Sequence, residues 1–247
     1  MEKGVILIEG STPALTYAGH HLQENGYTIA SQITPDIQYV LLDVPSFHSE
    51  SKLRNGKSLD TLLAALPGNV VLCGGNLSNP KLDTYQTFDL LQDAQYLAEN
   101  AAITADCAVR LAMQHLTATL TDTPILIIGW GRIGKCLARM LRGLDCDVHI
   151  AARKEADRAI LSAMGYPALN ITEVKPEQYR LILNTAPAPV LDVSNCKYCV
   201  KIDLASAKGL IGEDVIWARG LPGMYAPMTS GKLIAKTFMR MAQEVRS

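Results

Sequence analysis

The chain has 247 residues, of which 48% are hydrophobic and 19% charged, and 23 basic residues almost balance 24 acidic ones. This composition predicts a folded protein with a sizeable core and excludes the clustered positive charge that nucleic acids or anionic membranes attract, so we expect a small-molecule partner. The apolar runs are too short for a signal peptide or a membrane helix, and the six cysteines are scattered. We therefore expect a cytoplasmic protein with reduced thiols.

Short apolar runs alternate with longer amphipathic stretches along most of the chain. We predict strands at residues 4–8, 27–30, 39–44, 70–73, 125–128, 148–151, 181–183 and 200–204. We predict helices at residues 13–24, 59–66, 88–116, 133–144, 155–164 and 230–246. This alternation indicates an α/β fold with doubly wound parallel sheets.

A polar turn from Leu120 to Pro124 separates two series of similar size. It predicts two doubly wound domains: a flavodoxin-like substrate domain over residues 1–120, linking helix included, and a Rossmann dinucleotide-binding domain over residues 121–247. We expect the final helix, which follows the Gly220–Gly223 turn, to cross back and pack on the first domain. The chain would then cross between the two domains twice, and the two crossing segments would frame an interdomain cleft.

The second predicted domain begins with a glycine-rich loop between a strand and a helix. The loop sequence is Gly129-Trp130-Gly131-Arg132-Ile133-Gly134. In a dinucleotide site the first glycine makes the tight turn, the second lets the backbone approach a pyrophosphate, and the third lets helix and strand pack closely. The first turn of the helix would offer free amides to the phosphates.

The strand that follows this helix ends in Ala152-Arg153-Lys154. An NAD-dependent enzyme keeps an acidic residue here for the ribose 2′-hydroxyl, whereas cations suit the 2′-phosphate of NADP. We therefore predict NADP as the cofactor. NAD stays an alternative, because a solvated Arg153 at a strand end fits the same pattern.

Two further strand ends provide candidate cofactor contacts. Asn184-Thr185-Ala186-Pro187 would pass the nicotinamide ribose, and Asp203-Leu204-Ala205, followed by Ser206, would face the nicotinamide. We predict no metal site, because the Cys196–Cys199 pair lacks a second ligand pair and the histidines form no metal-binding motif. The polar loop over residues 46–58 is either a solvated surface loop or a ligand contact beyond a strand end.

From about Phe88 onward, the sequence resembles the A subunit of dipicolinate synthase, the spore-forming bacterial enzyme of pyridine-2,6-dicarboxylate synthesis. The segments that carry the resemblance are, in chain order, Asn100–Asp106, Gly129–Gly134, Ala151–Arg153, Asn184–Pro187, Asp203–Ser206, and Gly220–Pro227 with Thr229 and Gly231. Ile103, Asp106 and Cys107 replace the family's proline, glutamate and glycine. Ser206-Ala207-Lys208-Gly209-Leu210 replaces its Ser-Arg-Pro-Gly-Gly.

The resemblance implies an NADP-dependent oxidoreductase of CH–CH donors in dipicolinate biosynthesis during sporulation. Hydride would pass from a dihydrodipicolinate-like cyclic dicarboxylate to NADP⁺. The residues that we expect near the reacting ring are Thr104, Asp106, Ser206 and Lys208, with Arg54 or Lys52 as carboxylate partners. Thr104 and Asp106 could alternatively cap the first turn of a helix.

The resemblance also implies a second, flavoprotein-like synthase subunit, and we expect a homo-oligomer. Two alternative functions stay open. One is an NADP-dependent reductase of another imine or keto acid, because the family's arginine is lost from this segment and Lys208 offers only a point charge. The other is a non-catalytic NADP-binding subunit whose partner supplies the chemistry.

Overall fold

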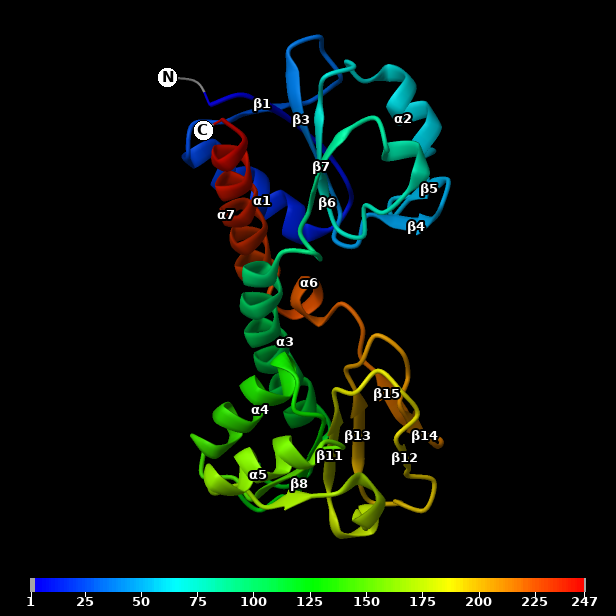
Figure 1. The fold of residues 1–247 in the computed structure, drawn as a ribbon, viewed down its shortest axis with the longest axis vertical. Helices are drawn as coiled ribbons and strands as arrows, with labels where there is room; N and C mark the ends of the chain where they lie inside the picture. The colour runs from blue at the N-terminus through cyan, green and yellow to red at the C-terminus, as the bar shows by residue number, and fades with distance from the viewer. Residues whose placement is uncertain (1–2, 247) are drawn as a thin grey trace. The chain divides into compact units, whose positions relative to one another are not determined.

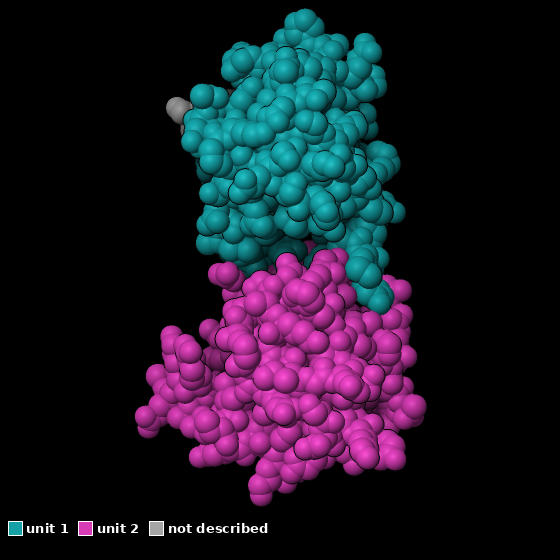
Figure 2. Space-filling view, turned by 90° about the vertical axis from the view of Figure 1, so that its right-hand side faces the viewer, with its two compact units in different colours: residues 1–100, 222–247 teal, residues 101–221 magenta. Residues whose placement is uncertain are grey.

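The computed structural model describes residues 3–246, and the chain forms two compact units (Figures 1 and 2). Unit 1 comprises Met1–Asn100 and Pro222–Ser247, and unit 2 comprises Ala101–Leu221. We predicted a boundary at the turn after residue 120, with the linking helix in the first domain. The compact units instead divide this helix between them, and the final helix belongs to unit 1.

Unit 1 is built on five parallel strands in the order β2-β1-β3-β6-β7. They are β1 (Val5–Glu9), β2 (Thr28–Ala30), β3 (Ile37–Leu42), β6 (Val71–Gly74) and β7 (Gln86–Asp89). Numbered within the unit, this order is 2-1-3-4-5, the order of flavodoxin-like sheets. Ligands of such sheets bind at the carboxyl ends of the strands, where the strand order reverses between β1 and β3.

The helices of unit 1 are α1 (Pro13–Glu24), α2 (Leu59–Ala65), the start of α3 (Ala94–His115), α6 (Leu221–Tyr225) apart from its first residue, and α7 (Pro227–Arg246). Two short strands, β4 (Phe47–Ser49) and β5 (Lys52–Leu53), pair as an antiparallel hairpin within the loop that was predicted at residues 46–58. A 3₁₀ turn covers Pro80–Leu82. Leu59 and Leu62 of α2 join the core beneath the sheet.

The C-terminal helix α7 packs along α1 (Figure 1), which confirms the predicted return to the first domain. Gly231 allows this close approach, because a Cβ there would collide with the backbone oxygen of Ala14. Phe238 is fully buried and meets the rings of Tyr27 and Tyr39 edge-on at 5.5 and 5.0 Å between centroids. The aromatic core of unit 1 is therefore completed by the last segment of the chain.

Unit 2 is built on six parallel strands in the order β10-β9-β8-β11-β13-β15. They are β8 (Ile125–Ile128), β9 (Val148–Ala151), β10 (Ala168–Leu169), β11 (Leu181–Asn184), β13 (Val200–Asp203) and β15 (Val215–Trp217). Numbered within the unit, the order is 3-2-1-4-5-6, which is that of the Rossmann fold. The predicted Rossmann fold of this part of the chain is confirmed.

The principal helices of unit 2 are α4 (Arg132–Arg142), α5 (Glu155–Ala163) and the remainder of α3. Its smaller elements are the paired strands β12 (Leu191–Asp192) and β14 (Leu210–Ile211) and the 3₁₀ turns Ile171–Glu173 and Pro176–Gln178. The short helix α6 (Leu221–Tyr225) follows β15. Within residues 3–246, none of the helices combines the length and hydropathy needed to span a bilayer.

Two predicted helix starts are wrong. Phe88 is a buried residue of the edge strand β7, and α3 begins only at Ala94, where the Asp93 carboxylate accepts a hydrogen bond of 2.7 Å from the Tyr96 amide. The final helix begins at Pro227 rather than Ser230, and the predicted Gly/Pro-rich turn lies partly within α6. Proline fits the first turn of a helix because the amide it lacks has no intrahelical partner there.

Candidate dinucleotide site at the carboxyl edge of the second sheet

The three glycines of the loop after β8 have distinct steric surroundings. Gly129 has a φ of +99°, and a Cβ on it would lie 2.6 Å from Thr185 Oγ1. A Cβ on Gly134 would collide with the carbonyl oxygen of Gly129, so only glycine permits this helix–strand packing. A Cβ on Gly131 would meet no protein atom within 4 Å, so the backbone there faces open space.

The first turn of α4 borders this open space. Gly131 is the N-cap residue and provides no side chain, and Gly131 and Arg132 are both exposed. The first amides of a helix have no intrahelical acceptor and carry the positive end of the helix dipole. An anionic group is the ligand that this terminus binds best.

The turn after β9 presents two cationic side chains. Ala152 is buried, whereas Arg153 and Lys154 are exposed, and neither forms an ion pair in the part of the chain that the structure describes. Arg158 Nη1 donates to the carbonyl oxygens of Ala152 and Arg153 at 2.9 and 2.7 Å. Arg158, which the sequence analysis missed, therefore fixes the backbone that carries these cations.

Trp130 does not extend freely from the glycine loop. Its ring centroid lies 6.1 Å from that of Tyr166, and Lys135 Nζ lies 5.7 Å from the indole centroid. Trp130 and Ile133 are both half-buried. The indole is thus held beside the loop, where a bound ligand would alter its fluorescence.

The side chains of Asn184 and Thr185 form hydrogen bonds with backbone atoms instead of facing solvent. Thr185 Oγ1 donates to the carbonyl oxygen of Ile128 at 2.9 Å, which ties the end of β11 to the glycine loop. Asn184 is fully buried, donating to Asp203 Oδ1 at 3.0 Å and accepting from the Ala186 amide at 3.0 Å. Of the predicted segment, only Pro187 is exposed.

Asp203 is the centre of a buried network at the end of β13. Its Oδ1 accepts from the Ala205 amide at 3.0 Å, and its Oδ2 accepts from the amides of Gly209 and Leu210 at 2.7 and 2.8 Å. The carboxylate is fully buried and therefore shapes the loop over residues 204–209 from inside. Leu204 and Ala205 are also buried.

Ser206 and Lys208 are exposed on this loop, and the next strand supplies its neighbours. Trp217 Nε1 donates to the Ala205 carbonyl at 3.1 Å. Arg219 Nη1 donates to the Ser206 carbonyl, and its guanidinium carbon lies 5.5 Å from the Trp217 ring centroid. The sequence analysis missed both residues, because β15 is short and has no motif.

Thr104 and Asp106 lie in the interior of α3, ten or more residues after its start, so the alternative that they cap its first turn is wrong. Residues two apart on a helix point about 200° away from each other. Thr104 is accordingly buried and Asp106 exposed. The two side chains therefore face different surroundings.

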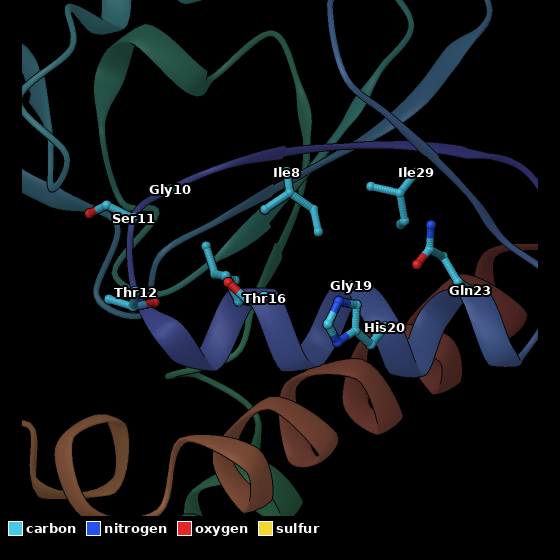
Figure 3. Close-up of a pocket in the computed structure, with 10 residues that line it drawn as sticks. Ile8, Gly10, Ser11, Thr12, Thr16, Gly19, His20, Gln23 and Ile29 are labelled. Carbon is cyan, nitrogen blue, oxygen red and sulfur yellow. The ribbon is translucent and has the colours of Figure 1, made fainter.

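The carboxyl edge of the sheet in unit 1 is closed by one of its own side chains. Asp43, 2% exposed, accepts hydrogen bonds from the amides of Ser11 and Thr12 at 3.1 and 3.2 Å. Lys52 and Arg54 are exposed at and just after β5. Beside α1 lies a pocket of about 420 Å³, in which Ile8 and Ile29 point from the strands toward the helix (Figure 3).

The two cysteines of the C-x-x-C segment are free thiols, and Cys196 is buried. Burial raises the pKa of the Cys199 thiol to about 12. A thiol with so high a pKa is protonated at neutral pH and is a poor nucleophile or metal ligand.

No known protein-family model matches the chain. The A subunit of dipicolinate synthase from Bacillus subtilis (strain 168) is 28% identical over 162 residues, and the matched region covers 60% of this chain and only 54% of that relative.

Two solved structures share the fold along almost the whole chain. The A subunit of dipicolinate synthase from Bacillus halodurans has a TM-score of 0.82 and 22% identity, with 98% of each chain covered. A transhydrogenase from Sinorhizobium meliloti has a TM-score of 0.70 and 13% identity, with 98% of this chain and 94% of that chain covered. By sequence, the chain is a homologue of the A subunit of dipicolinate synthase, and it shares the fold of that subunit.

Proposed function

We propose that this chain is an NADP-dependent oxidoreductase that transfers hydride from a dihydrodipicolinate-like cyclic dicarboxylate to NADP⁺, at a CH–CH bond whose second hydrogen leaves as a proton to solvent. The observation that carries the proposal is the open glycine loop at the carboxyl edge of a 3-2-1-4-5-6 sheet, followed one strand away by two exposed cations. In this fold the dinucleotide lies across the point where the strand order reverses, here between β8 and β11.

The residues at this edge fit a nicotinamide dinucleotide. The open space at Gly131 accommodates a pyrophosphate that any side chain at this position would displace, and α4 offers uncapped amides. Arg153 and Lys154 suit a ribose 2′-phosphate, which Arg153 can bind through two parallel hydrogen bonds. Residues 152–154 include no carboxylate that could bind the 2′-hydroxyl of NAD.

When bound, the nicotinamide supplies the hydride acceptor. The chain's own part is to bind and to orient. Asp203 holds the backbone that presents Ser206 and Lys208, whose ammonium group would neutralise a substrate carboxylate. Thr104 and Asp106 stay candidates near the ring, and their opposite orientations on α3 imply that one of them at most contacts it.

The cofactor is tested by titrating the full chain with NADPH and NADH and following tryptophan fluorescence. We expect one NADPH per chain and a preference over NADH. Arg153→Ala should lower the affinity for NADPH by about 10-fold, which corresponds to about 1.4 kcal/mol for the loss of a charged hydrogen-bonded contact. It should leave the affinity for NADH unchanged. The control Lys175→Ala removes another exposed cation of unit 2 and should change neither affinity. Binding of neither dinucleotide would refute the proposal.

The reaction is tested by following NADPH formation from dihydrodipicolinate. The chain is assayed alone and with a flavoprotein-like dipicolinate synthase subunit. Turnover by the chain alone supports the proposed oxidoreductase. Turnover that requires the partner identifies a cofactor-binding subunit, and turnover of other imines or keto acids instead identifies the alternative reductase.

A further inference from the structure

We propose that Arg219 determines substrate specificity in unit 2 by binding a carboxylate of the substrate at the carboxyl ends of β13 and β15. The proposal rests on the proposed function, in which a carboxylate-bearing ring is oxidised beside a nicotinamide. It assigns the charge-recognising role to a residue outside the segments that carry the family resemblance.

The first observation is the position of Arg219 on the sheet. Trp217 is in register with Asp203, and the Ala218 amide donates to the Asp203 carbonyl at 2.8 Å, so Arg219 follows directly where β15 leaves the sheet. Strands β11, β13 and β15 form the second half of the Rossmann sheet. The two halves of this fold each bind one mononucleotide, and the glycine loop assigns the adenosine side to the first half, which leaves the nicotinamide side to the second.

The second observation is that the guanidinium is held in place but not neutralised. It lies over the Trp217 ring, with its carbon 5.5 Å from the ring centroid, and one N–H donates to the Ser206 carbonyl. No acidic side chain forms an ion pair with Arg219 among residues 3–246, and the side chain is exposed. A guanidinium has five N–H donors, so several are left for a ligand.

Together these contacts favour a carboxylate as the ligand. The contact with the Trp217 ring and the Ser206 bond reduce the conformational freedom that Arg219 would otherwise lose on binding, and its planar fork matches the two oxygens of a carboxylate. Lys208 lies on the same loop as Ser206 and provides a second positive charge. The arrangement suits a ring with two carboxylates better than a neutral ring of the same shape.

The proposal is tested by calorimetric titration of the NADPH-saturated full chain with pyridine-2,6-dicarboxylate and with its neutral diamide. Arg219→Gln removes the charge and leaves a shorter, neutral polar side chain, and Arg219→Lys keeps the charge but removes the fork. We expect dicarboxylate affinity to fall about 10- to 100-fold in Arg219→Gln and by less in Arg219→Lys. Affinity for the diamide and for NADPH should stay unchanged. Lys197→Gln, which removes another exposed cation of unit 2, should have no effect.

Three outcomes would overturn the role of Arg219. The first is equal dicarboxylate affinity in the wild type and in Arg219→Gln. The second is an equal loss of dicarboxylate and diamide binding in Arg219→Gln, which would indicate a role only in loop structure. The third is no dicarboxylate binding by the wild type. Failure of the proposed function looks different. Arg219-dependent dicarboxylate binding without dihydrodipicolinate oxidation would retain this carboxylate site and refute the proposed reaction. Normal turnover of dihydrodipicolinate by Arg219→Gln would support the proposed reaction and refute the role of Arg219.

Discussion

Replacing Asp203 with asparagine should destabilise unit 2 strongly, because no orientation of the amide satisfies the donors around it. One carboxylate oxygen accepts from the Gly209 and Leu210 amides, and the other accepts from the Ala205 amide and from Asn184 Nδ2. An asparagine side chain has one acceptor oxygen and one donor nitrogen. In either orientation, two buried donors lose their acceptor and face an N–H group instead.

The expected loss follows from these two donors. Leaving a buried donor without an acceptor costs about 1–3 kcal/mol, so the free energy of unfolding should fall by about 4 kcal/mol. With a urea dependence of about 2 kcal/mol per molar, the unfolding midpoint should fall by about 2 M.

Tryptophan fluorescence can measure this loss because the chain has two tryptophans, Trp130 and Trp217, and both lie in unit 2. Asp192→Asn is the control: the exposed Asp192 accepts from the Ser194 amide at 2.9 Å, and its replacement should leave the midpoint unchanged. A midpoint for Asp203→Asn within error of the wild type would refute a structural role for this carboxylate and with it the account of the loop over residues 204–209.

Three further changes test other parts of the structure. Gly131→Ala should cost less than about 1 kcal/mol of stability yet lower the affinity for NADPH by about 10-fold or more, because its Cβ would enter the open space of the loop. Gly134→Ala should instead destabilise unit 2 by about 3 kcal/mol. Denaturation and NADPH titration of both variants separate the two effects. Hydrogen bonds from Lys236 and Gln95 hold the pKa of Glu99 below 4.5. These hydrogen bonds therefore stabilise the fold above pH 4.5, and their contribution is lost as the pH falls through the lower pKa that Glu99 has in the folded chain. Lys236→Met should raise the pKa of Glu99 in an NMR titration, and an unchanged pKa would contradict the pairing. Because desolvation raises the pKa of the half-buried Cys199 to about 12, this thiol should react more slowly with a disulfide reagent at pH 8 in the native chain than after unfolding. Equal labelling rates for Cys199 in the native and the unfolded chain would contradict the raised pKa.

The sequence predicted those parts of the fold that local patterns determine. The β8–α4 unit has a buried apolar strand, three glycines at fixed spacing and an amphipathic helix, and each of these is visible in consecutive residues. The helix at residues 13–24 was predicted to the residue, because Pro13 begins it and Gly26 follows its end.

Features that depend on contacts between distant residues were not predictable. The β7 strand is only four residues long and is recognisable through its pairing with β6, so Phe88 was assigned to a helix. Asp203 was predicted to face the cofactor from its place at a strand end. Nothing in Asp203-Leu204-Ala205 shows that the amides of residues 209 and 210 fold back onto its side chain, so these contacts were missed. Arg219 was missed for the same reason, since its partners Ser206 and Trp217 identify it only once β13 and β15 are paired.

The two units place a similar strand–turn–helix at the point where strand order reverses, but they use it differently. In unit 1, Asp43 reaches the amides of Ser11 and Thr12, and Gly10 makes room for it, because a Cβ there would lie 2.8 Å from Asp43 Cγ. A phosphate at this turn would have to displace a buried carboxylate and would repel it. In unit 2, Thr185 instead bonds to the backbone of β8, and the first turn of α4 is left without a side-chain cap. The same architecture is thus closed to anions in one unit and open in the other, so a dinucleotide phosphate suits the turn of unit 2 and not that of unit 1.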